Sequence, residues 1–87
     1  MWFVYILRCA DDALYIGETN DVETRFLKHQ EGRASVFTSQ RRPLVLAYFE
    51  QHPDRGAALK RERQLKRWTR AKKEALIAGD LLLLKRL

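Results

Sequence analysis

Only one hydrophobic core fits into a chain of 87 residues, because even a well-folded domain of about 60 residues buries only about 60% of the surface that its unfolded chain exposes. We therefore expect residues 1–87 to form a single domain, with any functional site built on that one core. Hydrophobic residues make up 46% of the sequence and charged residues 32%. This balance is typical of a folded protein rather than of a disordered chain.

The hydrophobic pattern predicts a small three-stranded sheet. The aromatic and β-branched run Trp2–Leu7 and the run Leu14–Gly17 are typical of strands, and residues 10–13 between them favour a turn, so the two runs should pair as a hairpin. A third strand is expected over Leu44–Phe49, directly after Pro43. Tyr5 and Tyr15 then lie on neighbouring strands.

Helices are expected between and after these strands. Asn20 as N-cap, with Glu23 three residues later, predicts a helix to about Gln30. Asp54 caps a long helix through about Trp68, and Thr69 caps another that runs to Ala78. Residues 33–42 are polar without periodicity, and residues 81–87 are expected to form a last helical turn whose leucines cover the core. The class is α+β, with the order ββαβα plus a helical tail.

The charge points to a polyanionic partner. Lys and Arg number 17 against 11 Asp and Glu, for a net charge of +6 and a pI near 9.9. Such an excess favours nucleic acid, although a small protein can also be basic for solubility alone. Placement of the charges must distinguish the two.

The single cysteine, Cys9, cannot form a disulfide within the chain or build a zinc site, which favours a reducing, cytoplasmic location and a role as core filler. The apolar run that begins at Met1 is too short to span a bilayer and lacks the features of a signal peptide. We expect no membrane partner.

Glu62 is the candidate metal ligand. Ala58, Glu62 and Leu65 fall at helical spacings of four and three, which places a carboxylate on the small and apolar stripe of a basic helix. Glu62 could pair with Arg25 or Lys66 and stabilise the packing, or it could hold a cation, and spacing alone does not decide. Magnesium commonly takes one or two carboxylates and fills its other positions with water or phosphate oxygens.

Five residues together resemble the GIY-YIG nuclease superfamily. Tyr5 and Tyr15 are ten positions apart, Arg25 follows ten later, His29 four after that, and Glu62 lies in a downstream helix. Phe3-Val4-Tyr5 stands where the family has GIY, and Tyr15-Ile16-Gly17 matches YIG literally. The resemblance covers about Trp2 to Ile77 and is closest in length to small stand-alone bacterial members.

This resemblance implies an antiparallel sheet and an endonuclease that hydrolyses phosphodiester bonds of DNA with one Mg²⁺ or Mn²⁺ ion, in repair or nucleic-acid turnover. In that assignment Tyr15 is the general base or orients the attacking water, and Tyr5 supports it. Arg25 binds the phosphate and offsets developing charge. His29 transfers a proton or orients a neighbour, and Glu62 holds the cation.

Three positions depart from the family pattern. Phe3 replaces the first glycine of GIY. Glu18 stands where many members have lysine, and it could weaken phosphate binding, add a metal contact or point away. Glu74 lies near the place of a late asparagine found in several branches.

Basic residues on the long helix and on the preceding loop are expected to bind a phosphate backbone. The candidates are Arg33, Arg41, Arg42, Lys60, Arg63, Lys66, Arg67 and Arg70. Two other functions remain open: a catalytically weak or inactive nucleic-acid-binding module, and a basic scaffold that docks an acidic protein. A nuclease of this size could also depend on a protein partner for targeting.

Overall fold

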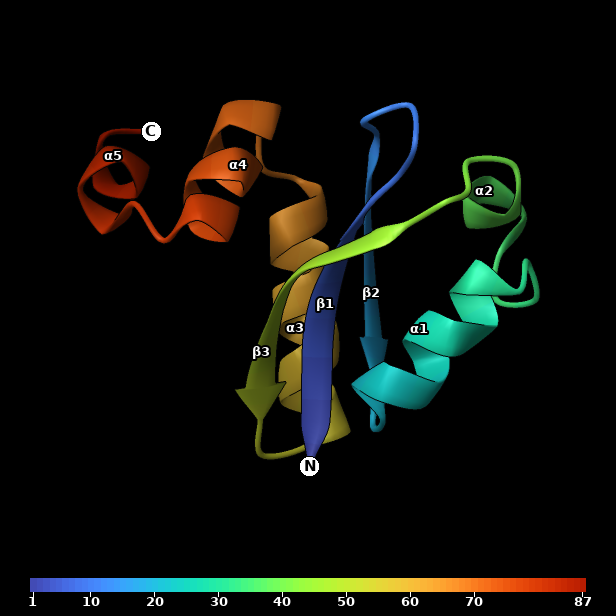
Figure 1. The fold of residues 1–87 in the computed structure, drawn as a ribbon. Coiled ribbons are helices and arrows are strands. Elements are labelled where there is room, and N and C mark those ends of the chain that lie inside the picture. Colours follow the sequence, from blue (N-terminus) through green and yellow to red (C-terminus); the bar gives the residue numbers. More distant parts are fainter.

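The computed structural model describes residues 1–87 and contains one antiparallel sheet of three strands. The strands are β1 (Trp2–Arg8), β2 (Leu14–Thr19) and β3 (Val45–His52), in the order β2-β1-β3 (Figure 1). β1 pairs with both neighbours, which explains its unbroken hydrophobic sequence, because a central strand covered on both faces exposes neither. The predicted α+β class and the hairpin are confirmed.

Helices cover the two faces of the sheet unequally. α3 (Arg55–Lys66) crosses behind the sheet in Figure 1 and is followed by α4 (Arg70–Ala78). The core on this side joins residues of β1 and β2 to both helices: Val4, Ile6, Ile16, Ala58, Leu65 and Leu76. α1 (Val22–Gln30) and the short α2 (Val36–Ser39) lie beyond β2. Tyr5, Leu7, Cys9 and Leu44 form the second, smaller core, against which Tyr15 and Phe26 pack.

The helix starts follow the sequence closely, with two corrections. Asp54 and Thr69 cap α3 and α4 as predicted. The N-cap of α1 is Asp21 rather than Asn20, because its carboxylate accepts from both the amide and the hydroxyl of Thr24. α2 was not predicted at all; Ser35 caps it, in a segment too short to show periodicity.

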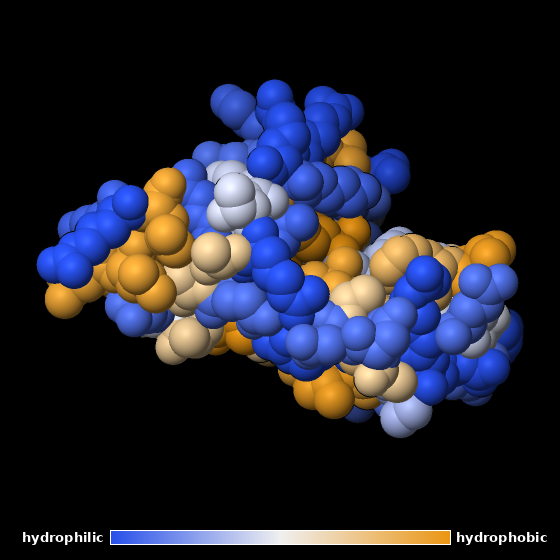
Figure 2. All heavy atoms as spheres, turned by 90° about the horizontal axis from the view of Figure 1, so that it is seen from above, coloured by the Kyte–Doolittle hydropathy of each residue, from blue (hydrophilic) through white to orange (hydrophobic).

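The C-terminal helix α5 (Leu81–Arg86) corrects the prediction that its leucines cover the core. Only Leu84 packs against the core, whereas Leu82 is 74% exposed. Four consecutive leucines point around nearly the whole circumference of a helix, so they cannot share one buried face. Hydrophobic atoms therefore gather on the surface at this end of the molecule, on the left of Figure 2.

Two carboxylates brace the helices against the sheet. Glu50 of β3 accepts hydrogen bonds from the Arg61 side chain of α3, at 2.9 Å from Nε. The carboxylate of Glu74 on α4 accepts hydrogen bonds from Arg8 of β1 at 2.6 Å and from Arg70 at 3.0 Å. The Arg8 and Arg70 guanidinium groups outweigh the partial burial of Glu74 and lower its pKa to about 2. These contacts fix α3 to β3 and α4 to β1.

Cys9, predicted as core filler, is a buried free thiol. No helix of the structure combines the length and the hydrophobicity that crossing a lipid bilayer requires.

Candidate active site

The site begins where Tyr5 crosses Gly17. The two residues are directly opposed across β1 and β2, so they face the same side of the sheet. A Cβ atom at position 17 would come within 2.6 Å of Tyr5 Cζ and even closer to the phenol oxygen. The missing side chain therefore creates the space in which the Tyr5 ring extends across the edge strand. The YIG triplet has glycine at this position for a steric reason.

His29 of α1 holds the Tyr5 phenol in place. Tyr5 Oη lies 2.9 Å from His29 Nε2, and both side chains are buried. Burial, and next the nearby Arg25 cation, lower the pKa of His29 to about 4. The imidazole is therefore neutral at neutral pH and has one donor and one acceptor nitrogen.

Thr38 of α2 decides which nitrogen carries the proton. His29 Nδ1 lies 2.8 Å from Thr38 Oγ1, and the Thr38 hydroxyl donates to the Ser35 carbonyl at 3.4 Å. Thr38 Oγ1 then accepts from Nδ1–H, and Nε2 accepts from the phenol of Tyr5. Buried hydrogen bonds thus run in one direction from Tyr5 to the turn that precedes α2.

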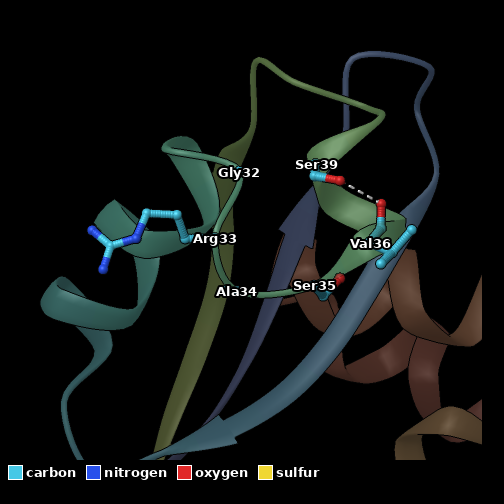
Figure 3. Close-up of a pocket in the computed structure, with 6 residues that line it drawn as sticks. All are labelled: Gly32, Arg33, Ala34, Ser35, Val36 and Ser39. Atoms are coloured by element: carbon cyan, nitrogen blue, oxygen red, sulfur yellow. Dashed lines mark hydrogen bonds between the residues drawn. The ribbon is translucent and has the colours of Figure 1, made fainter.

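That turn is stabilised by its own serines. Ser35 Oγ accepts from the Thr38 amide at 3.1 Å, and Ser39 Oγ donates to the Val36 carbonyl at 2.8 Å (Figure 3). Ser35, Val36 and Ser39, with residues 32–34, line a shallow hollow, and the Arg33 side chain points away from it. Short-range bonds therefore hold α2 where Thr38 can contact His29.

Tyr15 stands beside this pair but remains partly exposed. Its ring centroid lies 5.1 Å from that of His29 and 6.4 Å from that of Tyr5. Burial, followed by the proximity of Tyr15, raises the pKa of Tyr5 to about 12. Tyr5 therefore stays a neutral donor, and of the two phenols only Tyr15 reaches solvent.

Arg25 is a half-buried guanidinium that forms no ion pair with any carboxylate. It lies close enough to His29 to help lower the pKa of that imidazole, and close enough to Tyr5 to offset part of the rise in the pKa of that phenol. An unpaired cation in partial burial is costly unless an anion reaches it. The position is thus suited to a phosphate group.

Glu62 approaches from α3 on the other side of β2. Its negative charge makes the smallest contribution to raising the pKa of Tyr5. Its side chain is 15% exposed and pairs with Lys66 at 3.3 Å rather than with Arg25. Glu18, on the α3 face of β2, has one carboxylate oxygen 3.6 Å from Arg55 and a second without a hydrogen-bond partner. The structure therefore brings Tyr5, Tyr15 and His29 into contact, with Arg25 close enough to act on Tyr5 and His29. Glu62 comes from α3, which packs on the opposite face of the sheet.

The donor set fits a cation that needs little protein coordination. No group of three or more His, Cys, Asp or Glu side chains is arranged to hold a metal ion. Magnesium requires only one or two protein carboxylates when water and phosphate oxygens complete its shell. Glu62, which is partly exposed on α3, supplies one such carboxylate.

The comparisons agree with this geometry. The family model described as "GIY-YIG catalytic domain" matches residues 1–75. The chain belongs to the GIY-YIG family.

Similar proteins share nearly the whole length of the chain. A UPF0213 protein from Natronomonas pharaonis is 41% identical over 90% of this chain and 92% of its own. One from Staphylococcus aureus strain N315 is 45% identical over 86% of this chain and 92% of its own. The solution NMR structure of a UPF0213 protein from Bacillus halodurans, 37% identical, superimposes with a TM-score of 0.58 and covers 90% of this chain and 84% of that one.

The basic residues around this GIY-YIG site fall into two groups. Arg33, Arg41, Arg42 and Arg70 are engaged within the protein: Arg33 pairs with Glu31, Arg41 with Asp11 and Arg70 with Glu74, and Arg42 donates to backbone carbonyls. Along α3 the remaining candidates are exposed and, apart from Lys66, form no ion pair: Lys60, Arg63, Lys66 and Arg67. At 3.6 residues per turn, Lys66 and Arg63 border Glu62, whereas Lys60 and Arg67 point further outward.

Sequence reasoning missed Thr38 and Phe37, both on α2. Thr38 orients His29, and the Phe37 ring lies 6.1 Å from that of Tyr15. The Ser35–Thr38 spacing is compatible with a helix start and was the only available signal. It says nothing of the tertiary contact with His29.

Proposed function

We propose that the protein is a metal-dependent endonuclease that hydrolyses phosphodiester bonds of DNA. One observation carries the proposal: Arg25 is half-buried without a carboxylate partner and lies close enough to Tyr5 to act on its pKa, as Tyr15 and Glu62 also do. A phosphodiester supplies the anion that Arg25 lacks, and its reaction builds the negative charge that a guanidinium stabilises.

Each side chain has a task that its environment supports. Arg25 binds a non-bridging phosphate oxygen and offsets the charge that develops there. Tyr15, the accessible phenol, orients the attacking water and takes its proton. Tyr5 donates to His29 and supports the position of Tyr15, and the neutral imidazole keeps this arrangement fixed.

Glu62 is the residue that would hold the divalent cation, Mg²⁺ or Mn²⁺. When bound, such a cation neutralises phosphate charge and acts as a Lewis acid. Lys66, which pairs with Glu62 at 3.3 Å, is free to turn to a phosphate when the carboxylate binds a cation.

A cleavage assay tests the proposal. Labelled single-stranded, duplex and branched DNA, with RNA alongside, are incubated with and without Mg²⁺ or Mn²⁺. We expect metal-dependent cutting of DNA that falls by roughly 100-fold or more in Arg25→Ala, as for loss of one transition-state donor, and that is lost in Tyr15→Phe and Glu62→Gln.

Two matched variants control for folding and charge. Glu31→Gln removes an exposed carboxylate that pairs with Arg33, and Tyr48→Phe removes a phenol that bonds Glu50 on the α3 face. Both should cut at the wild-type rate. Salt-sensitive DNA binding without cutting under either metal would instead identify a binding module, and no binding at low salt would leave the protein-docking scaffold.

A further inference from the structure

A pocket on the open edge of β2 lies next to the candidate active site. Its volume is about 250 Å³, and it is lined by Leu14, Tyr15, Ile16, Phe37, Lys66 and Lys73. We call it the edge pocket. Its residues come from β2, from α2, and from the facing sides of α3 and α4. It therefore opens where the two faces of the sheet meet solvent.

We propose that the edge pocket binds one unpaired nucleobase of a DNA strand, with the adjoining phosphates on Lys66 and Lys73. The protein then acts on DNA with single-stranded character. This inference rests on the proposed endonuclease function, because the pocket shares Tyr15 with that site.

The lining suits a flat, aromatic ligand. Leu14 and Ile16 give apolar walls, and Tyr15 and Phe37 give two aromatic rings. Phe37 is 39% exposed, even though the Arg41 guanidinium stacks on its ring at 3.9 Å. Aromatic side chains bind any base by stacking. The volume lies somewhat below the usual range for whole small-molecule ligands, about 300 Å³ and above, and favours a single base.

The two lysines supply charge of the required sign. Lys73 is half-buried on α4 and has no carboxylate partner, and Lys66 is shared with Glu62 on α3. A cation that is partly desolvated and unpaired favours an anionic ligand. Apolar walls with a basic rim match a base attached to its phosphates better than they match an acidic peptide, which has no ring to stack.

The position of the pocket links base binding to cleavage. Lys66 follows Glu62 by one turn of α3, about 6 Å along the helix axis, and strand phosphates in B-DNA rise about 3.4 Å per nucleotide. A base in the edge pocket therefore places a phosphate within one or two nucleotides of Tyr15 and Glu62. In a duplex this base is stacked and paired, so it must be extruded first, which costs a few kcal/mol.

Fluorescence anisotropy without divalent metal separates base contacts from phosphate contacts. The probes are a labelled single strand, an abasic strand of the same length and charge, and a blunt duplex. We expect the wild type to bind the base-bearing strand at least about 5-fold more tightly than the abasic one, and more tightly than the duplex. Phe37→Ala should abolish this preference and Phe37→Tyr should retain it. Lys73→Gln should weaken binding of both strands.

Two exposed residues elsewhere provide controls. Phe49→Ala removes an exposed aromatic ring on β3, and Lys85→Gln removes a cation on α5; neither should change the preference. Equal wild-type affinity for the base-bearing and abasic strands, or a preference that survives in Phe37→Ala, would overturn the proposal. The same samples with Mg²⁺ or Mn²⁺ distinguish the two claims. Base preference without cutting under either metal supports the pocket and refutes the endonuclease, whereas cutting without base preference refutes the pocket alone.

Discussion

Acidification from neutral pH should destabilise the fold through His29. The pKa of His29 is lowered from 6.5 to about 4, chiefly by burial. Between these two pKa values the imidazole is protonated in the unfolded chain but neutral in the folded protein. The free energy of unfolding is therefore highest above the unfolded pKa of 6.5 and falls as the pH drops below it. Linkage gives a loss of about 2 kcal/mol between about pH 7 and about pH 5. A small domain has only about 5–15 kcal/mol in total.

Urea denaturation followed by tryptophan fluorescence measures this loss. Wild type and His29→Gln are compared at about pH 7 and about pH 5, and the difference between their two pH effects isolates the imidazole. The interval lies above the pKa of Glu50 and of Glu74, both of which are lowered from 4.5. We expect His29→Gln to be less stable at neutral pH, with a pH dependence smaller by about 2 kcal/mol. Identical pH dependence in the two proteins would refute the neutral, buried imidazole.

Three further substitutions test the packing around the site. Gly17→Ala should cost about 1–3 kcal/mol in urea denaturation because its methyl group displaces Tyr5, whereas Gly56→Ala, which meets only a carboxylate oxygen at 3.3 Å, should be nearly neutral. Glu74→Gln should lower the free energy of unfolding by about 1 kcal/mol at neutral pH, a value reduced because that side chain is 35% exposed and screened by solvent. This difference from wild type should vanish as the pH falls from 4.5 towards about 2. A difference that does not change with pH would refute the stabilising contact between Glu74 and Arg8. Thr38→Val should move the imidazole Nε2 and Nδ1 NMR signals and lower activity without abolishing it, and unchanged signals would contradict the orienting role.

Much of the fold could be predicted because local chemistry determines it. The hairpin follows from two β-prone runs around a turn, and Asp54 and Thr69 begin helices because their side chains accept from the amides of Ala57 and Lys72. The N-cap of α1 is Asp21, one position after the predicted Asn20. Two adjacent residues that can both cap differ only in backbone geometry, which sequence does not reveal.

The sequence predicted which residues belong to the candidate site but not the hydrogen bonds that join them. Spacing and resemblance named Tyr5 and His29, yet the bond between them joins positions 24 apart in the chain. Thr38 belongs to no recognisable motif, because α2 has only four residues. The position of Thr38 depends on its contact with the buried His29 ring. The basic residues give a second example. The sequence suggests that Arg70 is free to bind phosphate, whereas in the fold it forms a salt bridge with Glu74.

The side chains at the candidate site come from five separate elements, β1, β2, α1, α2 and α3, so no fragment of the chain contains a working centre. Detachment of α1 from the sheet separates Arg25 from the tyrosines, and detachment of α3 separates Glu62 from them. The candidate site is therefore a property of the completed tertiary structure alone.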